Sequence, residues 1–185
     1  MIREVMQDAE ERMNGAVVSL QSDLAGYRTG RANPHLLDKI MVEMYGVQMP
    51  LNQMASISVP EPQQLAIKPY DANAISAIER AIMSSDLGLM PNNDGKVIRL
   101  NLPRLTEERR RDLNRLVGRR VEEAKVAVRN VRRDALHDFR DMKNESMISE
   151  DEYYKAQDDL QELTDKFVKQ IDEIGKQKEA EIMEV

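Results

Sequence analysis

Apolar residues recur every three or four positions along three long segments of the chain, a spacing typical of the buried face of an α-helix. In the first segment these residues are Ile2, Met6, Ala9, Met13, Ala16, Leu20, Leu24 and Tyr27. In the second they are Leu113, Val117, Val121, Ala124, Val128, Val131, Ala135, Phe139 and Met142. In the third they are Tyr153, Ala156, Leu160, Leu163, Phe167, Ile171 and Ile174, with Ile182 close to the same line. Because each apolar stripe is narrow, the smallest arrangement that buries all three is a helical bundle.

The ends of these helices carry recognisable capping residues. Thr106 is an N-cap candidate, and Glu107 places negative charge in the first turn, where the helix dipole favours it. Ser149 and Glu152 have the spacing of a capping box, so the third helix is expected to begin at about residue 150. The loop between the second and third helices then comprises only residues 144–147, which makes those helices antiparallel neighbours. An oligomeric coiled coil is the alternative that the pattern leaves open.

Between the first and second helices the pattern becomes that of a different domain. All seven prolines lie between residues 31 and 104, and apolar residues alternate with others over residues 39–45, the period of a β-strand. Further strands are predicted at residues 47–51, 57–59, 65–68 and 97–102, a helix at residues 71–85, and turns at residues 45–46 and 92–95. The predicted fold class is α+β: an elongated antiparallel three-helix bundle of residues 1–29 and 105–185, with an inserted small α/β domain of residues 30–104.

Two short connections join the predicted domains. Gly30 allows backbone angles that other residues avoid, and Pro103 prevents the second helix from starting earlier. The residues predicted to form a hinge are Thr29, Gly30 and Arg31 in the first connection and Pro103, Arg104 and Leu105 in the second. A fixed elbow is the alternative that the sequence leaves open.

The net charge is −6, but the charge is unevenly distributed. Residues 104–143 hold 13 Lys and Arg against 8 Asp and Glu, whereas residues 144–185 hold 5 against 13. The second helix is therefore basic and the third strongly acidic. A basic face on an acidic protein can orient the molecule against a polyanion.

Within the basic helix, Arg129, Arg132 and Arg133 have no Asp or Glu three or four positions away in either direction. Side chains at that spacing are neighbours on a helix surface, and like charges there cost about 0.2–0.5 kcal/mol per pair. We therefore expect this arginine cluster to bind an external anion. Phosphate is the best match, because a guanidinium group can donate two hydrogen bonds to its oxygens. The alternative is that the cluster faces acidic side chains of a neighbouring helix.

The other arginines of this helix mostly have acidic residues at helical spacing, so we expect local ion pairs there. The expected pairs are Arg110 and Arg111 with Glu107, Arg119 with Glu122 and Glu123, and Arg120 with Glu123. Since aromatic residues make up only 4% of the chain, contacts of the arginine cluster with a nucleic acid are expected at the backbone rather than by base stacking.

Residue types typical of enzymes are scarce. Without cysteine there is no disulfide, thiolate zinc site or thiol nucleophile. His35 and His137 are expected to be isolated, and the eight glycines form no phosphate-binding loop. We therefore expect no catalytic residue, no metal and no cofactor. The first residues are too charged for a secretory signal, and no apolar run approaches the roughly 18 residues of a membrane span. A cytoplasmic protein without a membrane partner is expected.

Four segments of the chain match motifs of one known protein family. The segment of the basic helix is Val-Arg-Asn-Val-Arg-Arg-Asp-Ala at residues 128–135. Tyr-Arg-Thr-Gly-Arg-Ala-Asn-Pro at residues 27–34 resembles the first hinge strand of that family, and Leu-Pro-Arg-Leu-Thr-Glu-Glu-Arg-Arg at residues 102–110 resembles the second. Ser-Asp-Leu-Gly-Leu-Met-Pro at residues 85–91 resembles its glycine loop. Over essentially its whole length, the chain resembles the ribosome recycling factors of bacteria and organelles.

This resemblance implies an L-shaped molecule of tRNA-like dimensions, in which a three-helix bundle carries a β/α/β sandwich domain on a flexible elbow. Ribosome recycling factors bind the large subunit of the post-termination ribosome and, with elongation factor G and GTP, split the ribosome into subunits. The resemblance implies a monomer whose bundle contacts large-subunit rRNA. The inserted domain would face elongation factor G and the small ribosomal subunit.

By position, Arg132 corresponds to the arginine with which the family contacts rRNA, and Arg129 and Arg133 lie beside it. The residues expected to contact rRNA are Arg129, Arg132, Arg133, Lys125, Arg28 and Arg31. Arg104 occupies a position often held by proline in the family, which affects the expected stiffness of the elbow. The competing class is a helical scaffold or chaperone that binds proteins through its apolar stripes.

Overall fold

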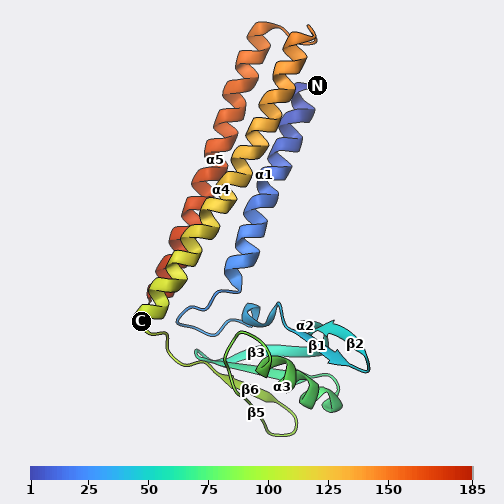
Figure 1. Ribbon diagram of the computed structural model, residues 1–185, viewed down its shortest axis with the longest axis vertical. Helices are drawn as coiled ribbons and strands as arrows, with labels where there is room; N and C mark the ends of the chain where they lie inside the picture. Colours follow the sequence, from blue (N-terminus) through green and yellow to red (C-terminus); the bar gives the residue numbers. More distant parts are fainter. Residues whose placement is uncertain (185) are drawn as a thin grey trace. The chain divides into compact units, whose positions relative to one another are not determined.

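The computed structural model describes residues 1–184 and combines long helices with small antiparallel sheets (Figure 1). The chain divides into two compact units. The first unit holds Met1–Leu24 and Asn114–Ala180, and the second holds Ala25–Leu113 and the residues from Glu181 onward. The predicted α+β fold class is confirmed.

Three helices supply the first unit: α1 (Ile2–Ala25), α4 (Glu107–Asn144) and α5 (Glu150–Met183). Figure 1 shows them side by side along most of their lengths. At a rise of 1.5 Å per residue, α4 alone spans roughly 57 Å. The bundle predicted from the three apolar stripes is therefore confirmed.

The helices begin where the capping residues predict. The Thr106 hydroxyl accepts a hydrogen bond from the Arg109 amide at 3.1 Å, at the start of α4. At the start of α5, the Ser149 hydroxyl accepts from the Glu152 amide at 3.1 Å, and the Glu152 carboxylate accepts from the Ser149 amide at 3.3 Å. The two bonds form the predicted capping box, which satisfies backbone amides that have no partner within the helix.

The buried line of α5 differs in part from the predicted stripe. Thr164, Gly175 and Lys178 are buried, whereas Leu163 and Ile174 are partly exposed. The prediction was wrong at these positions because it counted apolar residues alone. A hydroxyl group, a glycine and the stem of a lysine can each occupy a buried helix face when the partner helix leaves suitable space.

The second unit contains two antiparallel sheets. One is a hairpin of β1 (Met41–Met44) and β2 (Val47–Pro50). The other has the strand order β3 (Ala55–Glu61), β4 (Gln64–Pro69), β6 (Ile98–Asn101) and β5 (Pro91–Asn93). The helical segments are η1 (Pro34–Leu37), α2 (Leu51–Met54), η2 (Ala72–Ala74) and α3 (Ile75–Met83). Tyr45 and Gly46 connect β1 to β2 with φ values of 56° and 76°, a geometry typical of two-residue hairpin turns.

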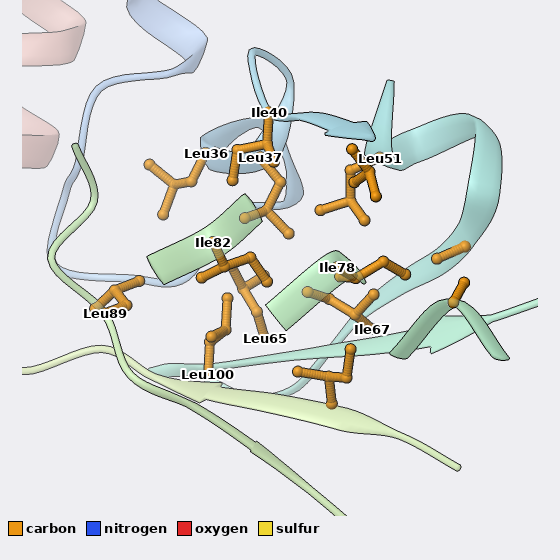
Figure 2. Packing of buried hydrophobic residues seen from close by; sticks show 14 of the residues in the cluster. Leu36, Leu37, Ile40, Leu51, Leu65, Ile67, Ile78, Ile82, Leu89 and Leu100 are labelled. Atoms are coloured by element: carbon orange, nitrogen blue, oxygen red, sulfur yellow. The ribbon is translucent and has the colours of Figure 1, made fainter. Parts of the chain in front are cut away.

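One hydrophobic core holds the second unit together (Figure 2). Ile78 and Ile82 on α3 are fully buried against Leu65 and Leu100 of the four-stranded sheet. Leu51, beside the hairpin, belongs to the same buried cluster. Helix α3 thus lies between the sheet and the hairpin segment, which is the expected β/α/β sandwich.

Several short elements of this unit were missed. The sequence predicted a turn at residues 92–95, but β5 pairs with β6 up to Asn93, and the turn begins at Asp94. The helix predicted at residues 71–85 is shorter, because its first turn is the 3-10 segment η2. Neither η1 nor α2 was predicted. These elements contain three or four residues each, too few for a hydrophobic period to be seen.

Candidate nucleic-acid interface

The three residues of the arginine cluster lie on one helix, α4. Arg129 and Arg133 are exposed, and Arg132 is half-buried. Within residues 1–184 none of the three forms an ion pair. The alternative that the cluster is neutralised by an acidic neighbouring helix therefore finds no support in the described part of the chain.

A neutral side chain on α5 holds the guanidinium group of Arg132. Arg132 Nη1 donates a hydrogen bond to Gln161 Oε1 at 3.3 Å, and Gln161 Nε2 donates to Asp165 Oδ1 at 2.9 Å. Arg132 and Gln161 line a surface hollow of about 130 Å³ together with Leu136 and Asp158. Although Asp158 lines the same hollow, no ion pair joins it to Arg132 among the residues described.

The acidic residue next to the cluster in sequence is engaged elsewhere. Asp134 Oδ2 accepts a hydrogen bond from Arg12 Nη2 of α1 at 3.0 Å. Both side chains are about half exposed, so the pair adds only about 0–1 kcal/mol of stability. Its effect on the site is that Arg12 partly neutralises the nearest negative charge.

Lys125 differs from the cluster because its ammonium group already has carboxylate partners. Its Nζ lies 2.5 Å from Asp172 Oδ1 on α5 and 3.5 Å from Glu122 Oε1. The hydrogen bond to Asp172 is the main cause that raises the pKa of Lys125. The side chain is only 14% exposed. Of the basic residues expected to contact rRNA, Lys125 is thus one whose charge is largely satisfied within the bundle.

The predicted local ion pairs of α4 are only partly correct. Arg111 pairs with Glu107 at 2.6 Å, as predicted. Arg120 does not pair with its expected partner on α4. It crosses to α1, where its Nε lies 2.6 Å from Asp23 and its Nη2 lies 3.0 Å from the Ser19 hydroxyl. The i±4 rule missed this pair because it considers one helix at a time.

Two further predicted pairs are wrong. Arg110 and Arg119 form no ion pair within residues 1–184, and the Nε atom of Arg110 is buried without a hydrogen-bond partner. Lack of a carboxylate partner is therefore not unique to the cluster. What sets Arg129, Arg132 and Arg133 apart is that three such groups lie within five consecutive positions of one helix.

The other two arginines expected at the site, Arg28 and Arg31, belong to the second compact unit. Arg28 Nη2 donates to the Pro103 carbonyl at 2.6 Å. Burial lowers the pKa of Arg28, and the positive charge of Arg109 lowers it further. Arg31 is exposed. Arg28 thus has a structural contact, whereas Arg31 presents its side chain to solvent.

The connections predicted as a hinge are fastened to one segment of the second unit. The Ala32 amide donates to the Pro62 carbonyl at 2.6 Å, and the Leu102 amide donates to the Gln63 carbonyl at 2.8 Å. Gly30 does not have the positive φ for which a glycine is needed. Instead, an added Cβ would lie 3.1 Å from the backbone oxygen of Glu184, a close approach that favours glycine.

The histidines are not isolated, contrary to prediction. His35 Nδ1 lies 2.9 Å from Asp38, and His137 Nδ1 lies 3.3 Å from Asp141. Across residues 1–184, no group of three or more His, Cys, Asp or Glu side chains is arranged to hold a metal ion. None of the described helices combines the length and apolar character needed to cross a membrane.

Comparisons with known proteins all point to one family. The family model described as "Ribosome recycling factor" matches residues 20–183. Ribosome-recycling factors from Roseiflexus sp. (strain RS-1) and Halalkalibacterium halodurans are each 55% identical over 185 residues, which is 100% of both chains. A solution structure of the ribosome recycling factor has a TM-score of 0.78 and 45% identity, and covers 100% of this chain and 98% of the other.

A second similar structure comes from models for the T. thermophilus ribosome recycling factor and the E. coli elongation factor G bound to the E. coli post-termination complex. It has a TM-score of 0.69 and 43% identity, with 100% of each chain covered. Fold and site together define a helical-bundle protein that presents a group of unpaired arginines. The chain belongs to the ribosome recycling factor family. The members of this family are translation factors and not enzymes.

Proposed function

We propose that this chain binds the large subunit of the post-termination ribosome and, with elongation factor G and GTP hydrolysis by that partner, splits the ribosome into subunits. Messenger RNA and tRNA are thereby released for a new round of translation. Membership of the recycling factor family supports the proposal, as does the relative bound to a post-termination complex with elongation factor G. The single observation that carries the RNA contact is the group of unpaired arginines on α4.

In this proposal the arginine cluster anchors the bundle on large-subunit rRNA. Guanidinium groups without carboxylate partners can donate two hydrogen bonds each to phosphate oxygens. Arg129, Arg132 and Arg133 form the core of the contact. Lys125 adds a weaker electrostatic contribution, because Asp172 already occupies its ammonium group. Arg28 and Arg31 are proposed as further rRNA contacts from the second unit.

The inserted domain of residues 30–104 is proposed to face elongation factor G and the small subunit. The bundle then consists of residues 1–29 and 105–185, and residues 29–31 and 102–105 form the hinge. Both connections hold the sheet domain through backbone hydrogen bonds to adjacent residues, Pro62 and Gln63. A partner that moves the domain would therefore bend the chain at the residues just outside these bonds.

The experiment compares two arginines of α4 in binding and splitting assays. Arg132→Gln removes a charge without a carboxylate partner, and Arg111→Gln removes one that is paired with Glu107. Hydrogen bonds to charged groups contribute about 1.5–3 kcal/mol, so Arg132→Gln should weaken binding to large ribosomal subunits by about tenfold or more. Arg111→Gln should leave it within about twofold.

Light scattering then follows the splitting of post-termination ribosomes by elongation factor G and GTP. Wild-type protein should lower the scattering. At a saturating concentration, Arg132→Gln should split ribosomes at part of the wild-type rate. Failure of the wild-type chain to split ribosomes would reject the proposed function. Equal binding by Arg132→Gln and wild type would reject the arginine anchor.

A further inference from the structure

We propose that Gln161, oriented by Asp165, is a positioning residue for Arg132. It holds the guanidinium group through a neutral oxygen and so leaves the positive charge available to an RNA phosphate. This inference rests on the proposed contact between Arg132 and rRNA. It adds a residue of α5 to the arginine cluster, whose three residues all lie on α4.

The hydrogen bonds give the Gln161 amide one orientation. A carboxylate only accepts hydrogen bonds and a guanidinium only donates them. The amide nitrogen must therefore face Asp165, at 2.9 Å, and the amide oxygen must face Arg132, at 3.3 Å. A side chain held in this way loses less rotamer freedom when a ligand binds, which favours binding.

The chemical type of residue 161 matters because its surroundings are acidic. Asp158, Glu162 and Asp165 flank it on α5. A carboxylate at residue 161 would form an ion pair with Arg132 and compete with phosphate for the guanidinium group. The amide makes a weaker, neutral hydrogen bond that an incoming phosphate can outcompete.

A second contact between the same two helices shows what happens when α5 presents a carboxylate instead of an amide. Lys125 of α4 meets Asp172 of α5 at 2.5 Å, and its side chain is only 14% exposed. Where α5 presents a carboxylate, the basic residue of α4 is neutralised. Where α5 presents Gln161, Arg132 keeps its charge and remains half-buried at the surface.

The test is Gln161→Glu, with Gln170→Glu as the charge-matched control. Gln170 lies on the same helix but lines a different hollow, beside residues of α1. The readouts are the Kd for purified large ribosomal subunits and its dependence on salt. Gln161→Glu should weaken binding about tenfold and reduce the slope of log Kd against log salt by about 0.7–0.9, the loss of one phosphate contact. Gln170→Glu should stay within about twofold of wild type. Equal effects of the two substitutions would overturn the proposal.

Two further variants separate this inference from the proposed function. Gln161→Met keeps the length of the side chain without adding charge, so it should weaken binding less than Gln161→Glu. In an Arg132→Gln background, Gln161→Glu should have no larger effect than Gln170→Glu, because its target is gone. If Arg132→Gln alone leaves binding unchanged, the rRNA contact itself is wrong. If Arg132→Gln weakens binding but Gln161→Glu does not, only the positioning role is rejected.

Discussion

Gly175 of α5 packs directly against Val121 of α4, so closely that an added Cβ would lie 2.6 Å from Val121 Cγ2. Nonbonded carbon atoms are normally about 3.5–4.0 Å apart. The two helices can therefore approach at this level only because residue 175 has no side chain. This contact explains why a glycine stands within the buried line of a long helix, where it is otherwise unfavourable.

We expect Gly175→Ala to destabilise the bundle. Overpacking costs about 1–3 kcal/mol, and the higher helix propensity of alanine returns at most about 1 kcal/mol. The free energy of unfolding, measured in urea, should fall by about 1 kcal/mol. Adding Val121→Ala should reduce the penalty by making room for the new methyl group.

The matched control is a second glycine of the helical unit. An added Cβ at Gly118 of α4 meets nothing within 4 Å, so Gly118→Ala should raise the free energy of unfolding by about 0.5–1 kcal/mol. If both substitutions stabilise the protein, the close approach of α4 and α5 at residue 175 is not as described.

Asp94 should make the stability of the second unit depend on acid pH. Hydrogen bonds donated by the backbone amides of Val97 and Lys96 hold the pKa of the Asp94 carboxyl well below its ordinary value of 3.8. A hydrogen bond from the Arg99 side chain lowers this pKa further. A lowered pKa in the folded state gives stability that is present above the unfolded pKa and is lost as the pH falls.

The measurement compares urea unfolding of wild type and Asp94→Asn. The wild type should be the more stable by a constant amount between about pH 7 and pH 5, and the difference should shrink as the pH drops below the ordinary carboxyl pKa. A stability difference that does not change down to about pH 2 would show that the charge of Asp94 does not stabilise the turn.

Lys125 should act at the opposite end of the pH scale. The hydrogen bond that its ammonium group donates to Asp172 raises the pKa of Lys125 above the ordinary 10.5. A lysine with a raised pKa contributes stability that is fully present below the unfolded pKa and is lost as the pH rises through the folded one. The stability advantage of wild type over Asp172→Asn should thus be constant up to about pH 10 and decline above it. A pH-independent difference would mean that packing, not charge, joins the two helices here.

The elements that the sequence predicted well are those whose cause is local. The capping box of Ser149 and Glu152 involves residues three positions apart, and the hairpin turn at Tyr45 and Gly46 involves two adjacent ones. The apolar residues of the long helices also repeat over many turns, so their helical period can be recognised from the sequence. Such features depend little on what the rest of the chain does.

Features that depend on a partner element were missed. Gly175 is buried because Val121 fills the space opposite, and β5 exists because β6 lies beside it. The pair between Arg120 and Asp23 joins two helices, so a rule about neighbours on one helix assigned Arg120 the wrong partner. Each of these needs the register between elements, which apolar periodicity alone does not give.

The candidate site shows the same division. The arginine cluster was recognisable because the absence of acidic residues at helical spacing is a property of α4 alone. Lys125 was grouped with these arginines although one of its partners, Glu122, lies three positions before it on α4. Its closer partner, Asp172, lies on another helix and could not be identified from the spacing. Gln161 was missed for the same reason, since only the antiparallel packing of α5 on α4 brings it to Arg132.

The most direct test of the central claim is the salt dependence of ribosome binding. The test would compare wild type with the triple variant Arg129→Gln, Arg132→Gln, Arg133→Gln in binding to purified large ribosomal subunits. Circular dichroism would confirm that the bundle of the variant stays folded. If the cluster neutralises one phosphate with each arginine, the slope of log Kd against log salt should fall by roughly 2 to 3. A folded triple variant that binds with the wild-type slope would contradict the account.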